Sequence, residues 1–230
     1  LADMEALLKG VPMEDVSIVF PISTCPASIV FSMYLSVAQS RGIVVSKLRG
    51  TSQNEPLKGR YSGYEPGVRY PEISLKMAGD ILEYAVKNMR HWNPINLNAP
   101  SFHTFDGTVG EEMGMTFAIG VAHLNEVMRW GLNIDDVAPR FGWFIDADID
   151  LLEEVAKYRA VRKVWAHLLK DKYGAKDPRS LRTRIAMSPA GYSLVAQQPL
   201  NNIIRLAFQT LAGVLGGVQS TFVAGFDEPI

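Results

Sequence analysis

The feature that most constrains this chain is a repeated alternation of short apolar runs with longer segments of helical periodicity. Short runs rich in apolar or β-prone residues predict six strands, at 16–22, 47–53, 94–98, 137–145, 183–187 and 218–224. Between them, apolar residues recur at helical spacing and predict five helices, at 29–38, 74–85, 110–130, 150–172 and 199–215. Strict alternation predicts parallel strands joined by right-handed crossovers.

Two α/β architectures fit this alternation. One is an open doubly wound sheet, and the other is a TIM-type (β/α) barrel with about six of its eight strands present. No Gly-x-Gly-x-x-Gly turn opens a predicted helix, which argues against a dinucleotide-binding fold. The 230 residues suit one large domain over 1–230. Because the chain begins with Leu1 and stops two residues after Glu228, we expect truncation at both ends.

The composition argues against several classes of partner. The formal net charge is -1 and the charges are well mixed, so the chain has no basic stripe for nucleic acid. No apolar run reaches the length of about 18 residues that a membrane helix needs. The single cysteine, Cys25, cannot form an internal disulfide. We therefore expect no nucleic-acid or membrane partner and a reducing, cytoplasmic location.

The most specific signal is a series of short motifs in a fixed order. Residues 50–58 read Gly-Thr-Ser-Gln-Asn-Glu-Pro-Leu-Lys and resemble the Gly-Thr-x-Gln-Asn-Asp-x-Leu-Lys stretch of cobalamin-dependent acyl-CoA mutases. Further matches follow in family order at 92–95, 138–144, 154–160, 191–197, 201–205, 219–220 and 226–228. The chain is thus similar over nearly its whole length to acyl-CoA mutases of the methylmalonyl-CoA mutase type.

This resemblance implies an architecture and a cofactor. In the family, a TIM barrel threads the CoA chain along its axis, and a separate domain binds adenosylcobalamin (coenzyme B12), whose cobalt–carbon homolysis starts a radical migration of the acyl-thioester group. The six strands would be the second to seventh of the barrel. The Asp-x-His-x-x-Gly signature of the cobalamin-binding domain does not occur in these residues. The resemblance therefore implies a separate cobalamin-binding domain or subunit, a heteromeric or dimeric assembly, and no metal ligand from this chain.

The resemblance assigns two candidate catalytic residues, both of which would contact the thioester carbonyl. Gln53 ends a predicted strand and matches the family glutamine, although a buried amide could instead satisfy a loop. The family histidine of Gly-Tyr-His aligns with Ser101 without a gap, and only a local shift brings His103 to that position. The choice between Ser101 and His103 stays open.

The candidate substrate-binding residues come from the same comparison. Arg140 matches an arginine that helps to hold CoA, although a surface ion pair is an equal alternative, and Asn54 is secondary because it can shape the turn. Where methylmalonyl-specific members carry an arginine for the free carboxylate, this chain has Gly63, or Tyr64 if one residue is inserted. Phe144 and Phe222 suggest an apolar lining.

Three residues match positions near the adenosyl group of the cofactor: Ser188, Gln219 and Glu228. Ser188 stands in place of a family glutamine, and Glu228 could equally be a solvated loop acid. Several polar family residues are thus replaced by smaller or apolar ones. The leading hypothesis is an acyl-CoA-binding barrel of an adenosylcobalamin-dependent carbon-skeleton mutase for an acyl group less polar than methylmalonyl. The alternative is a noncatalytic, mutase-like subunit that stabilises a catalytic partner.

Overall fold

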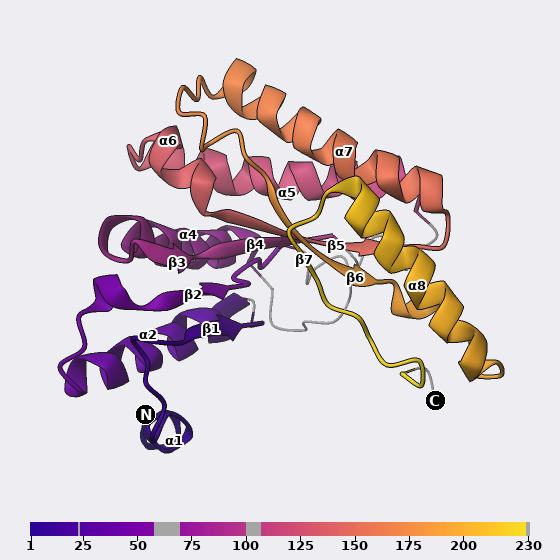
Figure 1. Cartoon of the computed structure of the whole chain (residues 1–230). Helices are drawn as coiled ribbons and strands as arrows, with labels where there is room; N and C mark the ends of the chain where they lie inside the picture. Colours follow the sequence, from indigo (N-terminus) through magenta and orange to yellow (C-terminus); the bar gives the residue numbers. More distant parts are fainter. Residues whose placement is uncertain (23, 58–69, 100–106, 229–230) are drawn as a thin grey trace. The chain divides into compact units, whose positions relative to one another are not determined.

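A computed structural model describes residues 1–22, 24–57, 70–99 and 107–228 of the chain. Along the described residues, strands and helices alternate as predicted, except that β3 and β4 follow each other without a helix (Figure 1). The strands are β1 (Ser17–Phe20), β2 (Arg49–Ser52), β3 (His91–Asn93), β4 (Ile95–Asn98), β5 (Phe141–Ala147), β6 (Arg184–Pro189) and β7 (Ser220–Thr221). The helices are α1 (Ala2–Leu7), α2 (Thr24–Ser40), α4 (Pro71–Asn88), α5 (Val109–Arg129), α6 (Ile134–Val137), α7 (Leu151–His167) and α8 (Pro199–Gly216).

The strands form two parallel sheets. The first has the order β1-β2-β3 and the second the order β4-β5-β6-β7, and every strand pair whose register is resolved is parallel. The α/β class and the parallel pairing are confirmed. The expected TIM-type barrel is not, because the described residues form two open sheets and no closed barrel.

Two strand predictions were wrong in detail, and one strand was missed. The predicted strand at 94–98 is confirmed as β4, but β3, just before Pro94, was not predicted, and the two strands belong to different sheets. The predicted strand at 137–145 begins only at Phe141, because the Asn133 side chain caps α6 and a 3-10 turn at Ala138–Arg140 follows. The strand predicted at 218–224 is reduced to β7.

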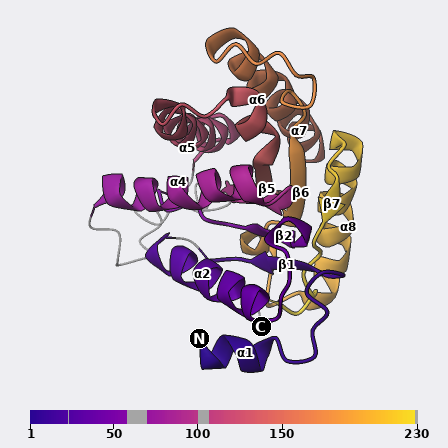
Figure 2. The ribbon, with the colours of Figure 1, turned by 90° about the vertical axis from the view of Figure 1, so that its left-hand side faces the viewer.

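The chain divides into two compact units. Unit 1 comprises Leu1–Leu97 and Ile119–Phe141, and unit 2 comprises Asn98–Ala118 and Gly142–Ile230. In unit 1, α2 and α4 lie side by side next to β1 and β2 (Figure 2). Its core surrounds Trp92, whose ring centroid lies 5.9, 5.5 and 5.4 Å from those of Phe20, Phe31 and Tyr34. Burial of this cluster raises the pKa of Tyr34 to about 12.

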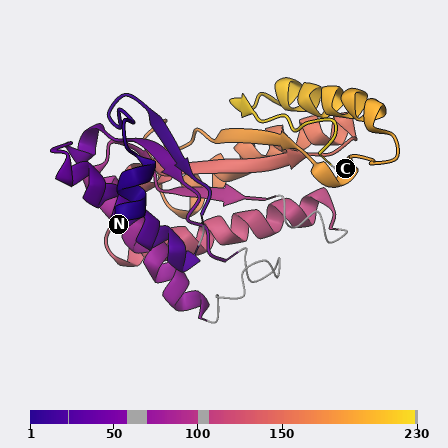
Figure 3. The same cartoon turned by 90° about the horizontal axis from the view of Figure 1, so that it is seen from below.

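In unit 2, α7 and α8 pack against each other, and α8 runs beside β6 and β7 (Figure 3). Its core contains Trp143, which lies 5.0 Å from Trp165 and 5.5 Å from Phe117 between ring centroids. The Asp150 side chain caps α7 by accepting from the Glu153 backbone N–H, and Gly217, with φ +77°, ends α8. Both helix boundaries agree with the sequence prediction to within one or two residues.

Candidate functional site

Strands β4, β5 and β6 each have one buried face and one face that is largely half-buried. On β5 this alternation is complete: Phe141, Trp143, Ile145 and Ala147 are buried, and Gly142, Phe144 and Asp146 are only partly so. The half-buried faces are therefore the parts of the strands that remain accessible to a ligand.

In unit 2, strand register places two candidate residues, Phe144 and Ser188, on the half-buried face. Phe144 is paired with Ala186, and Asp146, one step closer to the carboxyl ends of the strands, is paired with Ser188. The face is thus apolar at Phe144 and polar at Ser188. An apolar acyl group and a polar group could both be accommodated along these two strands.

In unit 1, Gln53 lies immediately after β2, at its carboxyl end. Its backbone N–H donates to the Phe20 carbonyl and its carbonyl accepts from the Asn96 N–H, both at 2.9 Å. The side chain is half-buried, and its amide has no hydrogen-bond partner among the described residues. The backbone is therefore fixed while the amide remains available to a ligand carbonyl.

Asn54, the next residue, has the opposite arrangement. Its side chain is 1% exposed, and its amide nitrogen donates to the carbonyls of Ala78 and Pro94, each at 3.0 Å. Its φ of +43° lies in the left-handed region, which asparagine tolerates better than most residues. Asn54 thus holds the turn that presents Gln53, and its own amide is already occupied.

Arg140 lies at the amino end of β5, away from Gln53. Its Nη1 donates to the Arg90 carbonyl at 2.6 Å and lies 3.3 Å from the carbonyls of Met89 and Trp92. The guanidinium therefore ties the 3-10 turn before β5 to the chain around β3. A role in holding CoA remains a prediction for this residue.

Two candidate cofactor residues of unit 2, Ser188 and Gln219, lie at different positions along β6. The Gln219 backbone N–H donates to the Ile185 carbonyl, so Gln219 lies three residues before Ser188 along β6. At about 3.3 Å per residue this separates them by roughly 10 Å along the strand. The Gln219 amide is also occupied, because it accepts from the Ile185 N–H at 2.7 Å and donates to the Gly217 carbonyl at 2.9 Å.

The remaining candidates are exposed or lie outside the described residues. Phe222 is 68% exposed, although its backbone N–H donates to the Met187 carbonyl at 2.8 Å. Glu228 is exposed, and its carboxylate has no partner among the described residues. Four candidates lie outside the described residues: Gly63, Tyr64, Ser101 and His103.

Sequence reasoning missed a buried pair of ionisable groups in unit 1. Glu55 and His123 are both 1% exposed, and Glu55 Oε1 lies 3.8 Å from His123 Nε2. The same carboxylate oxygen accepts from the Leu57 backbone N–H at 2.7 Å, so Glu55 closes the loop that follows Gln53. Helical periodicity places His123 within a helix but leaves packed and surface positions both open, and nothing in the sequence pairs it with Glu55.

A second buried cluster, also missed, lies in unit 2. Lys157 Nζ lies 2.7 Å from Glu154 Oε2 and 3.3 Å from Glu112 Oε2, and it donates to the Asp146 carbonyl at 2.8 Å. Burial raises the pKa of the Glu154 carboxyl above its ordinary value, although Lys157 acts in the opposite direction. Burial, followed by nearby carboxylates, also raises the pKa of Tyr158 and of Tyr192. The Glu-x-x-Lys spacing at 154–157 was the available signal.

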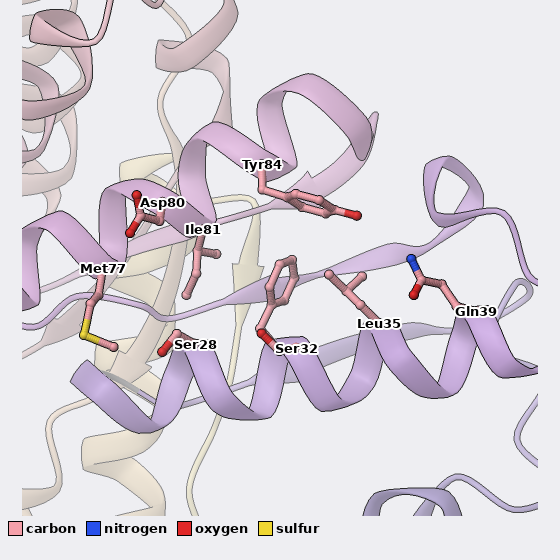
Figure 4. Close-up of a pocket in the computed structure, with 9 residues that line it drawn as sticks. Ser28, Ser32, Leu35, Gln39, Met77, Asp80, Ile81 and Tyr84 are labelled. Atoms are coloured by element: carbon pink, nitrogen blue, oxygen red, sulfur yellow. The ribbon is translucent and has the colours of Figure 1, made fainter. Parts of the chain in front are cut away.

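A groove on unit 1 lies apart from the half-buried strand face. It holds about 470 Å³ between α2 and α4 (Figure 4). Ser28, Ser32 and Leu35 line it from α2, and Met77, Asp80 and Tyr84 line it from α4. Neither Gln53 nor another candidate site residue is part of its lining.

None of the helices in the described ranges is long and apolar enough to cross a membrane. Within the same ranges, no group of three or more His, Cys, Asp and Glu side chains is arranged to hold a metal ion.

Comparison with known proteins supports the motif series. A model of the methylmalonyl-CoA mutase family matches residues 1–230. The large subunit of 2-hydroxyisobutanoyl-CoA mutase from Aquincola tertiaricarbonis is 36% identical over 228 residues, covering 99% of this chain and 40% of that protein. Methylmalonyl-CoA mutases from Escherichia coli (strain K12) and Homo sapiens are each 32% identical over 99% of this chain, which covers 32% and 30% of their lengths. The chain thus spans well under half of these relatives.

Proposed function

Because this chain belongs to the methylmalonyl-CoA mutase family, we propose that it is the acyl-CoA-binding part of an adenosylcobalamin-dependent mutase. The observation that carries the proposal is the geometry at Gln53. Backbone hydrogen bonds fix this residue at the carboxyl end of β2. Its side-chain amide has no hydrogen-bond partner among the described residues. In parallel α/β folds, ligands bind at the carboxyl ends of the strands. We further propose that the two parallel sheets are parts of one TIM-type barrel.

Gln53 would donate its amide N–H to the thioester carbonyl of the substrate. Asn54 would act indirectly, because its hydrogen bonds to Ala78 and Pro94 hold the turn on which Gln53 lies. Either His103 or Ser101 would contact the same carbonyl. Arg140, at the opposite end of the strands, would help to hold the CoA moiety.

The acyl group is proposed to lack a free carboxylate. One relative at 36% identity is named for 2-hydroxyisobutanoyl-CoA, whose acyl group carries methyl groups and a hydroxyl rather than a second carboxylate. The half-buried pairing of Phe144 with Ala186 would favour such a group by removing apolar surface from water. Neither Gly63 nor Tyr64 could neutralise a carboxylate as an arginine does.

The residues of unit 2 fit a cofactor in part. Ser188 lies on the half-buried face of β6, and the Glu228 carboxylate has no partner among the described residues, so both could hydrogen-bond to a nucleoside. Gln219 would first have to release the Ile185 N–H and the Gly217 carbonyl. Adenosylcobalamin, when bound, would supply the radical chemistry of the rearrangement, while this chain would bind and orient the acyl-CoA. A cobalamin-binding domain or subunit would hold most of the cofactor.

The test of this function is turnover by the intact protein with its cobalamin-binding partner and adenosylcobalamin. We expect kcat/KM to be higher for 2-hydroxyisobutanoyl-CoA than for methylmalonyl-CoA. A preference for methylmalonyl-CoA would contradict the proposed acyl group. No turnover of any acyl-CoA, together with a higher melting temperature of the partner in the complex, would instead support the noncatalytic alternative.

The role of Gln53 is tested by Gln53→Ala in the same assay. Removing a single hydrogen bond to a buried carbonyl should cost about 1–3 kcal/mol, or roughly 5- to 150-fold in kcat/KM. Gln39→Ala is a matched control, because Gln39 is an exposed glutamine on α2 and should leave turnover unchanged. Equal activity of the two variants would exclude the thioester contact.

A further inference from the structure

The carboxyl end of β5 is held by buried side chains that come from α7 and α8. Three successive backbone carbonyls of the strand accept hydrogen bonds from these side chains. Tyr158 Oη donates to the Ile145 carbonyl at 3.4 Å, Lys157 Nζ to the Asp146 carbonyl at 2.8 Å, and Gln209 Nε2 to the Ala147 carbonyl at 2.8 Å. Support of this kind from outside the sheet is what a binding site needs, because it fixes the positions of the side chains that the strand presents.

One of the three donors is charged, and stability alone does not account for it. Lys157 is buried together with the carboxylates of Glu112 and Glu154. Taking these charges out of water is costly, and apolar side chains of similar volume often stabilise a fold as well or better. The cluster does, however, fix the backbone of Asp146, whose side chain lies on the half-buried face of β5. Its buried charges therefore support the one acidic residue on that face of the strand.

Two more polar side chains lie around the apolar centre of the same face. The Ala99 backbone N–H donates to the Phe144 carbonyl at 2.9 Å, so parallel pairing places Asn98 beside Phe144. Asp146 lies two residues further along β5, beside Ser188. Neighbouring strands are about 4.8 Å apart, and two residues of a strand span about 6.6 Å. A small group that rests on Phe144 is therefore within reach of the Asp146 carboxylate.

Asn98 is an independent sign that this face receives a ligand. Its Oδ1 atom is buried and has no hydrogen-bond partner among the described residues. A buried polar atom without a partner costs free energy, which a ligand that donates a hydrogen bond would recover. The Asp146 carboxylate is also an acceptor. The face is thus suited to a ligand that is apolar over Phe144 and carries a hydrogen-bond donor.

The surrounding charge favours a donor over a carboxylate. Tyr192 lies just after β6, and its pKa is raised by burial and then by the carboxylates of Asp148, Glu112 and Asp146. Negative charge therefore dominates at this end of the strands. An acyl group with a free carboxylate would be repelled here, whereas a hydroxyl would be attracted.

We propose that Asp146 determines the acyl specificity of this site by accepting a hydrogen bond from a hydroxyl on the acyl group, while Phe144 packs against its methyl groups. The inference rests on the proposed function and adds the residue that separates a hydroxyacyl group from an alkyl one. A carboxylate has about four acceptor positions, so Asp146 can accept from a ligand in addition to its existing partners.

The experiment measures acyl-CoA binding to the intact protein with its cobalamin-binding partner, without adenosylcobalamin, so that no turnover occurs. The two ligands are 2-hydroxyisobutanoyl-CoA and pivaloyl-CoA, in which a methyl group replaces the hydroxyl. The parent protein should bind the hydroxyacyl ester about 10- to 100-fold more tightly. Asp146→Ala should reduce this ratio to less than about threefold, and Asp146→Asn, which keeps an acceptor oxygen, should give an intermediate ratio.

A second reading separates the charge of Asp146 from a structural role. Asp146→Asn should bind methylmalonyl-CoA about fivefold more tightly than the parent protein, because a repelling charge is gone, whereas structural damage would weaken binding. Asp171→Ala, which replaces an exposed aspartate of the same unit, should keep the ratio of the parent protein. The affinity for free CoA, measured for every variant, shows whether the rest of the site is intact.

The outcomes distinguish this inference from the proposed function. If Asp146→Ala and Asp146→Asn bind free CoA normally and keep the ratio of the parent protein, the role of Asp146 is excluded and the mutase assignment stands. If the alanine variant does not fold, the ratio of the asparagine variant decides. If the parent protein binds neither acyl-CoA, the proposed function fails, and this inference fails with it.

Discussion

The two units bury ionisable side chains in different ways. In unit 2, Lys157 has three partners within 3.3 Å, namely two carboxylates and a backbone carbonyl. In unit 1, neither ring nitrogen of the buried His123 has a hydrogen-bond partner among the described residues, and the Glu55 oxygen at 3.8 Å is beyond hydrogen-bond distance.

The difference reflects what each side chain can do without a partner. A lysine beside two buried carboxylates must stay charged and paired, whereas an imidazole can be neutral at ordinary pH. Unit 2 is therefore held by an ionic cluster in which each member depends on the others. Unit 1 tolerates an incompletely satisfied site beneath the loop that presents Gln53.

The largest effect should come from breaking the cluster of unit 2. Lys157→Met keeps a similar volume but leaves Glu112 and Glu154 buried without their cation, so the free energy of unfolding should fall by about 3–5 kcal/mol. In unit 1, His123→Leu removes two ring nitrogens that lack hydrogen-bond partners, and it should change the free energy of unfolding by less than about 1 kcal/mol. Guanidinium-induced unfolding measures both, with the exposed Arg159→Met as control. Equal losses in the two units would contradict the comparison.

A second contrast concerns the buried amides of the two units. Asn54→Ala removes hydrogen bonds to two carbonyls and places alanine at a φ of +43°, which together should cost about 2–4 kcal/mol. Asn54→Gly should cost about 1–2 kcal/mol less, because glycine adopts this conformation freely.

The order of the two substitutions should reverse at Gln209 in unit 2. This residue lies within α8, so Gln209→Gly should be less stable than Gln209→Ala by about 1 kcal/mol. The measurement is the midpoint of chemical unfolding for all four variants. If glycine were the worse residue at both positions, the positive φ of Asn54 would not matter for stability.

Two close-packed glycines give a smaller contrast. A Cβ at Gly50 in unit 1 would meet the Ile18 carbonyl and lie 2.5 Å from the Trp92 ring, neither of which can move easily, so Gly50→Ala should cost about 1–3 kcal/mol. A Cβ at Gly213 in unit 2 would meet the flexible end of Met187, and alanine favours a helix. Gly213→Ala should therefore change stability by at most about 1 kcal/mol. A larger loss of stability for Gly213→Ala than for Gly50→Ala in thermal unfolding would contradict this prediction.

The elements of the fold were predictable wherever the signal is local. The Asp150 cap and the apolar spacing after it determine where α7 starts, and both can be read from neighbouring residues. The division of the sheet at Pro94 was not predictable, because it depends on which distant strands pair on each side of the proline. Alternation also cannot distinguish an open sheet from a closed barrel, since both repeat the same strand–helix unit.

For the candidate site, the sequence motifs identified individual residues but not the contacts between distant ones. The motif already made Gln53 the primary candidate and Asn54 a turn-shaping residue, but the carbonyls that the Asn54 amide contacts belong to distant residues and could not be predicted. The partnership of Glu55 with His123 joins residues far apart in the chain. No spacing rule connects such residues, so sequence reasoning could place each one but not the pair.

The smallest predicted effect is a pH dependence confined to unit 2. Burial raises the pKa of Glu154 in the folded protein above its unfolded value, so between the two pKa values the folded state binds more protons than the unfolded state. The contribution of Glu154 to stability is therefore largest below the unfolded pKa and is lost as the pH rises through the folded pKa. The Glu154→Gln variant has no ionisable group at this position, so its stability should not show this decrease as the pH rises.

The measurable quantity is the difference in free energy of unfolding between Glu154→Gln and the parent protein across a pH series. It should shift in favour of the variant as the pH rises, and become constant above the folded pKa of Glu154. Glu153→Gln, which replaces an exposed carboxylate on the same turn, controls for the loss of one charge. A shift in favour of the parent protein would mean that the attraction of Lys157 outweighs burial, because an ion pair strong enough to lower the pKa of Glu154 reverses the sign of the linkage.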